Sequence, residues 1–510
     1  MLRFHGPAWL AVVALLPGHF LARPTVALER DLDIILAGGR VIDPESGLDA
    51  VRHVGLRGDR IVAVSEKTLE QRLRPGGTRL DVSGLVVSPG FIDLHAHGQS
   101  ARANEFQAHD GVTAALELES GFPLVARWLA SRAGKALVHF GVSVAHREVR
   151  TLVLPELGPR AAAELAAITG DFDASYPLPG SVCLLGRRET LPDDRLPALR
   201  EGLEQGLREG ALGIGMPHEY YPGADRREIF RVFQFAAEKG VPIFTHVRST
   251  GVEPMQEVIA DAAATGASLH IVHVNSKSLG QLPVVLDLIA GCQRHGLDVT
   301  TEAYPYTASS TFIQSAIFDD GWRERQGIDY GDVQWQATRE RLTAESFARY
   351  RQQGGIVIVH KMKEEMIELA MGTPFVMIAS DGMPYAPGAH PRSAGTFSRV
   401  LGRYVRERGT MSLREALGKM TVMPARRLER VAPAMTNKGR LREGADADVT
   451  VFDPARVRDT ATFETDLSFS EGIRHVLVAG TFVVRDGATV AGVFPGRAIV
   501  GERQREPGRQ

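Results

Sequence analysis

Sulfur is scarce in this chain, which has two cysteines, Cys183 and Cys292, among its 510 residues. Two cysteines cannot form the disulfide framework of a small secreted domain, and no Cys-x-x-Cys pair with zinc-site spacing is present. They can form one disulfide or remain two buried free thiols. A metal site in this protein must therefore do without the commonest sulfur ligand.

An excess of charge is also missing, because 59 lysines and arginines nearly balance 61 aspartates and glutamates, for a formal net charge of −2. This balance gives no electrostatic reason to expect nucleic acid or an acidic membrane surface as a partner. The composition is that of an ordinary globular protein, with 44% hydrophobic and 24% charged residues. We expect a small-molecule partner, and the sequence leaves open whether the chain forms a homo-oligomer.

Long hydrophobic runs are absent except near the N-terminus. Arg3 precedes a mostly apolar run from Pro7 to Phe20, and Thr25-Val26-Ala27 ends in a small residue. This order is typical of a secretory signal peptide, and the run is shorter than the roughly 20 residues that span a bilayer. The alternatives are a frayed cytosolic end or an apolar arm packed on the fold. We expect residues 1–27 to be a signal peptide and the mature protein to be periplasmic or secreted, with no membrane attachment.

Short apolar runs separated by turn signals occur near both chain ends. Gly38-Gly39 and Asp43-Pro44 separate such runs at one end, and Asp486-Gly487 follows a hairpin pattern at the other. Each group is too small to hold its own core. We therefore expect residues 28–85 and 436–500 to form one small composite β-sandwich domain.

Between these segments, strand-like runs alternate with helix-like stretches. Gly84 to Leu94, Val241 to Val247 and Leu269 to Val274 are runs of the first kind, and Arg226 to Lys239 is of the second. Repeated strand–helix–strand patterns indicate a parallel sheet with crossover helices. About eight units fit, so the predicted fold class is α/β, with a (β/α)8 TIM-like barrel over residues 86–435. The longer stretch from Phe312 to Gly354 is either a lid or extra helices.

The strongest chemical signal is the run Pro89-Gly90-Phe91-Ile92-Asp93-Leu94-His95-Ala96-His97. Two histidines separated by one residue on a strand point to the same face, so both imidazoles can reach one metal ion. The preceding apolar run places them at the carboxyl end of a strand, where barrel enzymes keep their active sites.

Later strand-like runs also end in metal-ligand side chains. His246 ends one run, His273 ends the next, and Asp381 follows Phe375 to Ser380. A single histidine after an apolar run is more often a core residue than a ligand. Four histidines and an aspartate at successive strand ends instead indicate a metal site.

With these motifs the chain resembles the amidohydrolase superfamily and, within it, the N-acyl-D-amino-acid deacylases or D-aminoacylases. The resemblance covers most of residues 32–490. Its landmarks are Gly90 to His97, Gly210-Ala211-Leu212-Gly213, Thr245-His246-Val247-Arg248, Tyr304-Pro305-Tyr306-Thr307-Ala308-Ser309-Ser310, Ser380-Asp381-Gly382, His390-Pro391-Arg392, Lys419-Met420-Thr421 and Gly444-Ala445-Asp446-Ala447-Asp448. His146 and Arg150 match a further landmark to which no role is given.

The resemblance implies a set of metal ligands and one or two Zn²⁺ ions per chain. The implied ligands are His95, His97, His246, His273 and Asp381, and Asp381 would also carry protons. The family's deacylases supply a cysteine after the second strand, and here that stretch holds Glu117 and Glu119 instead. A carboxylate can replace a thiolate as a bridging anion. Glu119 lies nearer the strand end and is favoured, with Glu117 as the rival.

The sequence also offers residues that could contact the substrate. Arg392 and Arg248 could bind a substrate carboxylate, Tyr221 and Tyr306 could bind the amide or carboxylate, and His390 belongs to the same landmark as Arg392. The family's lysine two residues after the last histidine ligand is replaced here by Asn275, with Lys277 two residues further on. This departure leaves the preference for D-amino acids open.

The expected function is hydrolysis of a carbon–nitrogen amide bond, with deacylation of N-acyl-D-amino acids as the leading hypothesis. In that hypothesis a metal-activated water attacks the carbonyl, and Asp381 takes and returns its proton. Hydrolysis of a cyclic amide or a dipeptide by the same superfamily is the alternative. A non-catalytic binding protein on the same fold is a minor alternative. It is disfavoured because every position that the family uses to bind metal carries a residue able to bind metal here.

Overall fold

A computed structural model describes Met1 and residues 30–168 and 184–502 of the chain. Apart from Met1, the predicted signal peptide lies outside the described residues, and so does Cys183. Cys292 is a buried free thiol. Within the described residues, no helix combines the length and apolar character needed to cross a membrane.

The centre of the molecule is a sheet of eight parallel strands whose ends approach each other. In sheet order the strands are β16 (Val376–Ile378), β12 (Val299–Ala303), β11 (Leu269–Ile271), β10 (Ile243–His246), β9 (Ile214–Pro217), β8 (His139–Ala145), β7 (Val112–Phe122) and β6 (Phe91–Asp93). Just beyond β6, Ala96 forms a parallel bridge with Gly382, and the amide of His97 donates to the Gly382 carbonyl at 2.8 Å. These contacts join the first strand to the last, so the predicted (β/α)8 barrel is confirmed.

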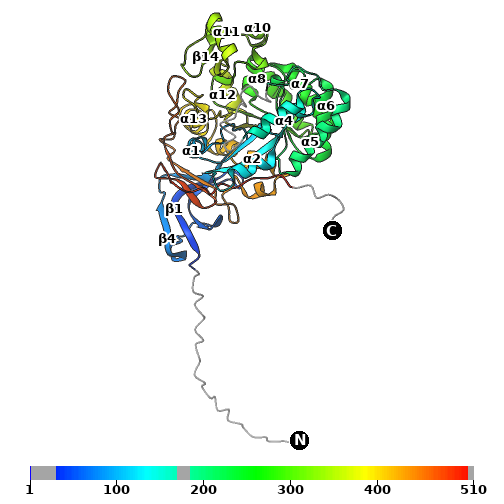
Figure 1. The fold of residues 1–510 in the computed structure, drawn as a ribbon. Coiled ribbons are helices and arrows are strands. Elements are labelled where there is room, and N and C mark those ends of the chain that lie inside the picture. Colours follow the sequence, from blue (N-terminus) through cyan, green and yellow to red (C-terminus); the bar gives the residue numbers. More distant parts are fainter. Residues whose placement is uncertain (2–29, 169–183, 503–510) are drawn as a thin grey trace.

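Helices follow the barrel strands and cover the outside of the barrel (Figure 1). They are α1 (Ala101–His109), α2 (Val125–Arg132), α3 (His146–Val153), α4 (Gly158–Ala167), α5 (Leu196–Arg208), α6 (Arg226–Lys239), α7 (Val252–Thr265), α8 (Val274–Ser278), α9 (Leu282–Arg294), α12 (Glu364–Gly372), α13 (Arg392–Arg399), α14 (Leu413–Met420) and α15 (Val422–Leu428). Local sequence sets their limits. In α6, the Asp225 side chain caps the Glu228 amide, and Gly240 ends the helix in a left-handed conformation at φ 66°.

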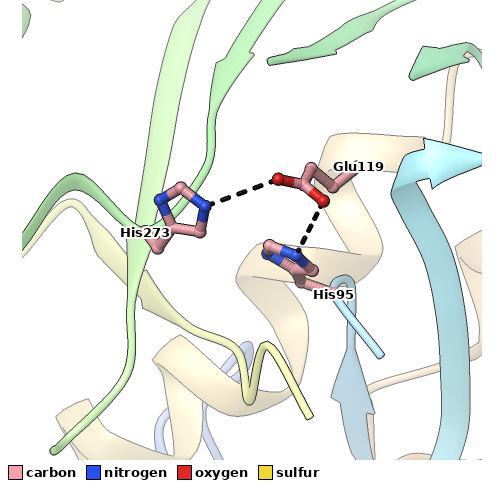
Figure 2. A group of neighbouring side chains, drawn as sticks. All are labelled: His95, Glu119 and His273. Carbon is pink, nitrogen blue, oxygen red and sulfur yellow. Dashed lines mark ion pairs between the residues drawn. The ribbon is translucent and has the colours of Figure 1, made fainter. Parts of the chain in front are cut away.

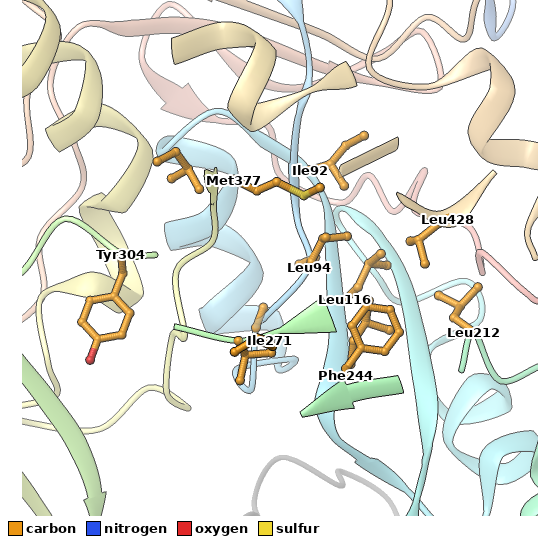
Figure 3. Close-up of a cluster of buried hydrophobic side chains, with 14 of the residues drawn as sticks. Ile92, Leu94, Leu116, Leu212, Phe244, Ile271, Tyr304, Met377 and Leu428 are labelled. Carbon is orange, nitrogen blue, oxygen red and sulfur yellow. The ribbon is translucent and has the colours of Figure 1, made fainter. Parts of the chain in front are cut away.

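Apolar side chains from neighbouring strands fill the barrel and the space beneath its helices. Figure 3 shows Ile92, Leu116 and Phe244 within this cluster, and each is at most 1% exposed. Close packing of this kind fixes the strand ends relative to one another. The polar groups that those ends carry are therefore held on a rigid frame.

A second sheet is built from both ends of the chain. Its strands are β1 (Leu32–Asp43), β2 (Leu48–Arg57), β3 (Arg60–Ser65), β4 (Leu73–Asp81), β5 (Val86–Pro89), β17 (Val449–Phe452), β18 (Ile473–Val478), β19 (Thr481–Arg485) and β20 (Ala488–Thr489). Antiparallel pairing of β5 with β17, from Val86↔Phe452 to Pro89↔Val449, joins the two halves. The prediction that both chain ends share one β domain is confirmed.

Asp448 connects the β domain to the base of the barrel. Its carboxylate accepts from Lys438 at 2.7 Å and from the Ala479 amide at 2.8 Å, and it lies 3.0 Å from Nε2 of His139 on β8. Burial opposes ionisation, but His139 and Lys438 hold the pKa of Asp448 well below its ordinary value. The last aspartate of the Gly444-Ala445-Asp446-Ala447-Asp448 landmark therefore has a structural role.

An insert with its own small core covers one end of the barrel. Strands β13 (Ala308–Phe312), β15 (Ile356–His360) and β14 (Val333–Trp335) form an antiparallel sheet in that order. Helices α10 (Trp322–Gln326) and α11 (Ala344–Gln353) pack on it through Trp322, Phe347 and Tyr350. Figure 1 places the insert at the end of the barrel opposite β1 and β4. The stretch predicted as a lid or extra helices thus combines a small sheet with helices.

Replacing Asp448 with asparagine should destabilise the protein by about 3 kcal/mol, because it removes the more deeply buried of the two carboxylates, Asp446 and Asp448, that compensate the buried Lys438. Glu471→Gln is the control, since Glu471 and its partner Arg458 are both more than half exposed and such pairs contribute about 0–1 kcal/mol. Denaturant unfolding measures both variants. An equal decrease in the free energy of unfolding in the two variants would contradict the structural role of Asp448.

Candidate metal centre

The predicted ligands converge at the carboxyl ends of the barrel strands. His95 and His97 follow β6, Glu119 lies on β7, His246 ends β10, and Asp381 follows β16. His273 follows β11 in the same way. All of them are buried. Strands far apart in the sequence thus deliver ligand-type side chains to one place, as in other barrel enzymes.

The first group consists of His95, His97 and Asp381. Nε2 of His95 lies 3.1 Å from Nε2 of His97, and Oδ1 of Asp381 lies 3.4 Å from each of these nitrogens. Their donor atoms all lie within 4.8 Å of one another. Two imidazole nitrogens and a carboxylate oxygen that face each other form a donor set that suits a divalent cation.

Glu119 lies between this group and the other two histidines. Its Oε2 is 3.4 Å from Nε2 of His97 and 3.6 Å from Nε2 of His95. Its Oε1 is 3.0 Å from Nδ1 of His246 and 3.5 Å from Nε2 of His273. Figure 2 shows the carboxylate directed at both His95 and His273. One carboxylate therefore faces all four imidazoles, as a bridging ligand would.

Glu117 occupies a different position from Glu119. Its Oε2 lies 2.7 Å from Nδ1 of His97, on the side of the ring away from the cluster. Glu302 on β12 relates to His95 in the same way, at 2.7 Å from Nδ1, and Glu219 lies 2.8 Å from Nε2 of His246. A carboxylate on the outer ring nitrogen fixes the tautomer and orientation of a ligand histidine. Sequence reasoning missed Glu302 and Glu219. Glu302 lies in the strand Val-Thr-Thr-Glu-Ala, which lacks the apolar run that marks the other ligands.

The backbone around the cluster is constrained. Oδ1 of Asp93 accepts from the amides of His95 at 3.1 Å and Ser380 at 3.0 Å, so one carboxylate fixes the first and last strand ends together. His273 and Asp381 have positive φ angles of 34° and 52°. Non-glycine residues rarely adopt such angles, and those that do cluster at functional sites.

The residues present fit zinc. Imidazole nitrogen and carboxylate oxygen are ordinary zinc donors, and the described residues contain two groups of donor atoms close enough for an ion, His95–His97–Asp381 and His95–Glu119–His273. Burial disfavours charge on Asp381, but Arg392 and His95 hold its pKa well below the ordinary value. Asp381 is therefore a carboxylate at neutral pH and can accept a proton.

A narrow cavity opens beside this cluster. Among its lining residues are five of the predicted ligands: His97, Glu119, His246, His273 and Asp381. The others are Glu219, Tyr220, Ser276, Lys277, Ser309, Ser310, Thr311, Phe312, Ile317, Gln326, Val359, Lys361 and Met383. Several belong to the insert, so the insert forms one wall of the cavity.

The two arginines predicted to bind substrate are engaged in ion pairs. Nη1 of Arg392 lies 2.8 Å from Oδ2 of Asp381, and its guanidinium lies over the ring of Tyr304. Arg248 binds Glu257 at 2.8 Å. Neither arginine lines the cavity. Arg392 therefore reaches the site through Asp381.

The other four predicted substrate contacts are also directed elsewhere. The Tyr221 hydroxyl lies 3.0 Å from Nδ1 of His146, and the Tyr306 hydroxyl lies 3.4 Å from Asp459. The Asn275 amide donates to the Tyr304 carbonyl, and the His390 ring lies 3.0 Å from the Ala308 carbonyl. None of the four lines the cavity, and each makes at least one hydrogen bond within the fold. Tyr220, Lys277 and the serines of β13 line the cavity instead.

The His146 and Arg150 landmark forms a buried network behind the site. Arg150 donates to Glu228 at 2.8 Å and to the Gly186 carbonyl at 2.7 Å. His146 links the network to Tyr221. The landmark therefore fixes the segment that leads into Tyr220 and Tyr221.

Comparisons with known proteins place this chain in a family. Residues 188–484 match the model of a family described as "Amidohydrolase family". The D-aminoacylase of Alcaligenes xylosoxydans xylosoxydans is 31% identical over 92% of this chain and 97% of its own length. The N-acyl-D-glutamate deacylase of the same organism is 29% identical over 89% and 94%.

Solved structures are similar over the same range. A D-aminoacylase crystal structure matches with a TM-score of 0.74 and 28% identity, covering 92% of this chain and all of that one. An N-acyl-D-glutamate deacylase from Bordetella bronchiseptica, solved with zinc and a phosphonate mimic of the tetrahedral intermediate, matches with a TM-score of 0.75 and 26% identity over the same shares. D-hydantoinase, at 17% identity and a TM-score of 0.59, shares the fold.

Glu119→Gln should lower zinc content by at least one ion per chain, because it removes the negative charge that faces all four imidazoles. Glu117→Gln keeps a hydrogen-bonding group behind His97 and should retain metal, with affinity weakened about 10- to 100-fold. Mass spectrometry after dialysis against buffered free zinc measures both variants. The opposite order of metal loss would assign the bridging position to Glu117.

Proposed function

Since this chain belongs to the amidohydrolase family, we propose that it hydrolyses the amide bond of N-acyl-D-amino acids and releases a carboxylic acid and a free amino acid. It is a metal-dependent hydrolase of carbon–nitrogen bonds other than peptide bonds. The observation that carries the proposal is the buried carboxylate of Glu119 between four imidazoles. Asp381 lies beside it, and lysines line the adjoining cavity. The preference for the D series is supported by the relatives named above.

Zinc would be held by two sets of residues that share Glu119. His95, His97 and Asp381 with Glu119 would hold one ion, and His246 and His273 with Glu119 would hold a second. When bound, zinc supplies Lewis acidity, which lowers the pKa of water toward neutrality and polarises the scissile carbonyl. Glu117, Glu302 and Glu219 would keep three of the histidines oriented toward the ions.

Asp381 carries the proton in this proposal. As the water oxygen bonds to the carbonyl carbon, a water proton passes to the Asp381 carboxylate. The C–N bond then breaks, and Asp381 returns the proton to the departing amine. Arg392 holds Oδ2 of Asp381, which leaves Oδ1 directed at His95 and His97. Arg392 thus acts as a positioning residue for the proton carrier.

The alternative of a cyclic-amide hydrolase has less support. Superfamily members that use a carboxylated lysine need a lysine at the site, and here β9 reads Ile214-Gly215-Met216-Pro217. A Cβ at Gly215 would lie 2.5 Å from the Glu119 carbonyl oxygen, so a larger side chain has no room behind the ligand strand. A dihydroorotase of Streptococcus pneumoniae is 24% identical to this chain, a lower identity than that of the deacylases.

Asp381→Asn should keep zinc bound but lower kcat by about 10²- to 10⁴-fold, because the amide cannot take the proton from water. Amine release from paired N-acetyl-D- and N-acetyl-L-amino acids measures turnover, with hydantoins and dipeptides as further substrates. Asp486→Asn, at a residue whose side chain is 63% exposed, is the control and should match the wild type. Full activity in the Asp381 variant would contradict the proton-transfer role, and wild-type turnover of hydantoins alone would overturn the proposed substrate.

A further inference from the structure

An N-acyl amino acid carries a carboxylate that does not react, and its binding site has to include a cation or strong hydrogen-bond donors. The arginines that the sequence offers for this role are already paired, Arg392 with Asp381 and Arg248 with Glu257. The position of the family's lysine is Asn275, whose buried amide donates to the Tyr304 carbonyl. None of these three residues lines the cavity, so the lining residues have to supply the cation.

Two lysines line the cavity, and they differ in how their charge is compensated. The Lys277 ammonium is paired with Glu219, and the same Glu219 oxygen lies 2.8 Å from Nε2 of His246. Lys361 directly follows β15 of the insert, and its Nζ donates to Oε1 of Gln326 at 3.2 Å. Among the described residues, no carboxylate lies within ion-pair distance of Lys361. Lys361 is thus the lining cation without a counter-ion.

The surroundings of Lys361 favour an anion. Burial, and secondarily the charge of Lys277, lower the pKa of Lys361 to about 7. A carboxylate bound beside the ammonium would restore the stabilisation that burial removes. Ser310 also lines the cavity, and its buried hydroxyl has no hydrogen-bond partner among the described residues. An ammonium and a free hydroxyl therefore lie in the same cavity as the proposed zinc ligands.

We propose that Lys361 receives a carboxylate of the substrate and that the insert, through Lys361, selects anionic N-acyl amino acids. The inference rests on the proposed function. The amide carbonyl would lie at the cluster of His97, Glu119 and Asp381, and the carboxylate would reach across the cavity to the insert wall. Either the α-carboxylate or an acidic side chain supplies the required chemistry, and the substrates below distinguish them.

The test compares Lys361→Met with wild type in the zinc-loaded protein, using N-acetyl-D-alanine, N-acetyl-D-glutamate and the neutral N-acetyl-D-alaninamide. Loss of a charged hydrogen bond should lower kcat/KM about 10- to 100-fold for the carboxylates and leave the amide unchanged. If kcat/KM falls for both acids, Lys361 binds the α-carboxylate. If kcat/KM falls for the glutamate derivative alone, Lys361 binds the side-chain carboxylate.

Two further variants make the result specific. Lys361→Arg keeps the charge and should retain most activity on the acids, which separates loss of charge from misfolding. Lys363→Met, at an exposed position two residues along, is the matched control and should equal the wild type. The role of Lys361 is overturned if Lys361→Met lowers kcat/KM equally for the acids and the amide, or if it lowers kcat/KM for none of the substrates. Wild-type protein that releases amine from none of the three substrates overturns the proposed function itself.

Discussion

The carboxylate of Glu119 is buried among four imidazoles, and much of the structure serves to keep it there. A buried charge is expensive unless opposite charge or hydrogen bonds compensate it. Burial opposes this charge, but the imidazoles of His246, His273 and His95 outweigh burial and hold the pKa of Glu119 well below its ordinary value. This carboxylate faces both halves of the proposed ligand set.

The histidines face Glu119 because the barrel and its buried acids leave them little freedom. Asp93 fixes the first and last strand ends, and the bridge between Ala96 and Gly382 closes the barrel directly at the ligands. Glu302, Glu117 and Glu219 each hold the outer nitrogen of one ring. Three ligands are thus oriented by separate carboxylates, which gives the cluster its geometry without a cysteine.

The sequence predicted the barrel, the composite β domain and the side chains of the cluster, because strand periodicity places ligands such as His95 and His246 at strand ends. It could not separate Glu117 from Glu119, since both lie on one face of β7 and only packing shows which lies inward. It also could not find Lys361, whose position depends on how the insert folds over the barrel. The sequence offered Arg392 as a substrate contact, and its ion pair with Asp381 depends on three-dimensional contacts that motif spacing does not reveal.

The insert and the barrel contribute different parts of the site. The barrel holds the proposed ligands and the proposed proton carrier on a rigid frame, and the insert forms the wall from Ser309 to Phe312 together with Lys361. Anomalous diffraction at the zinc edge from zinc-loaded crystals tests the central claim most directly. The account predicts one or two peaks, each with a Glu119 oxygen at about 2.0–2.2 Å and histidine nitrogens at about 2.0–2.1 Å. Zinc bound elsewhere, or bound at the histidines with Glu119 out of coordination distance, would contradict it.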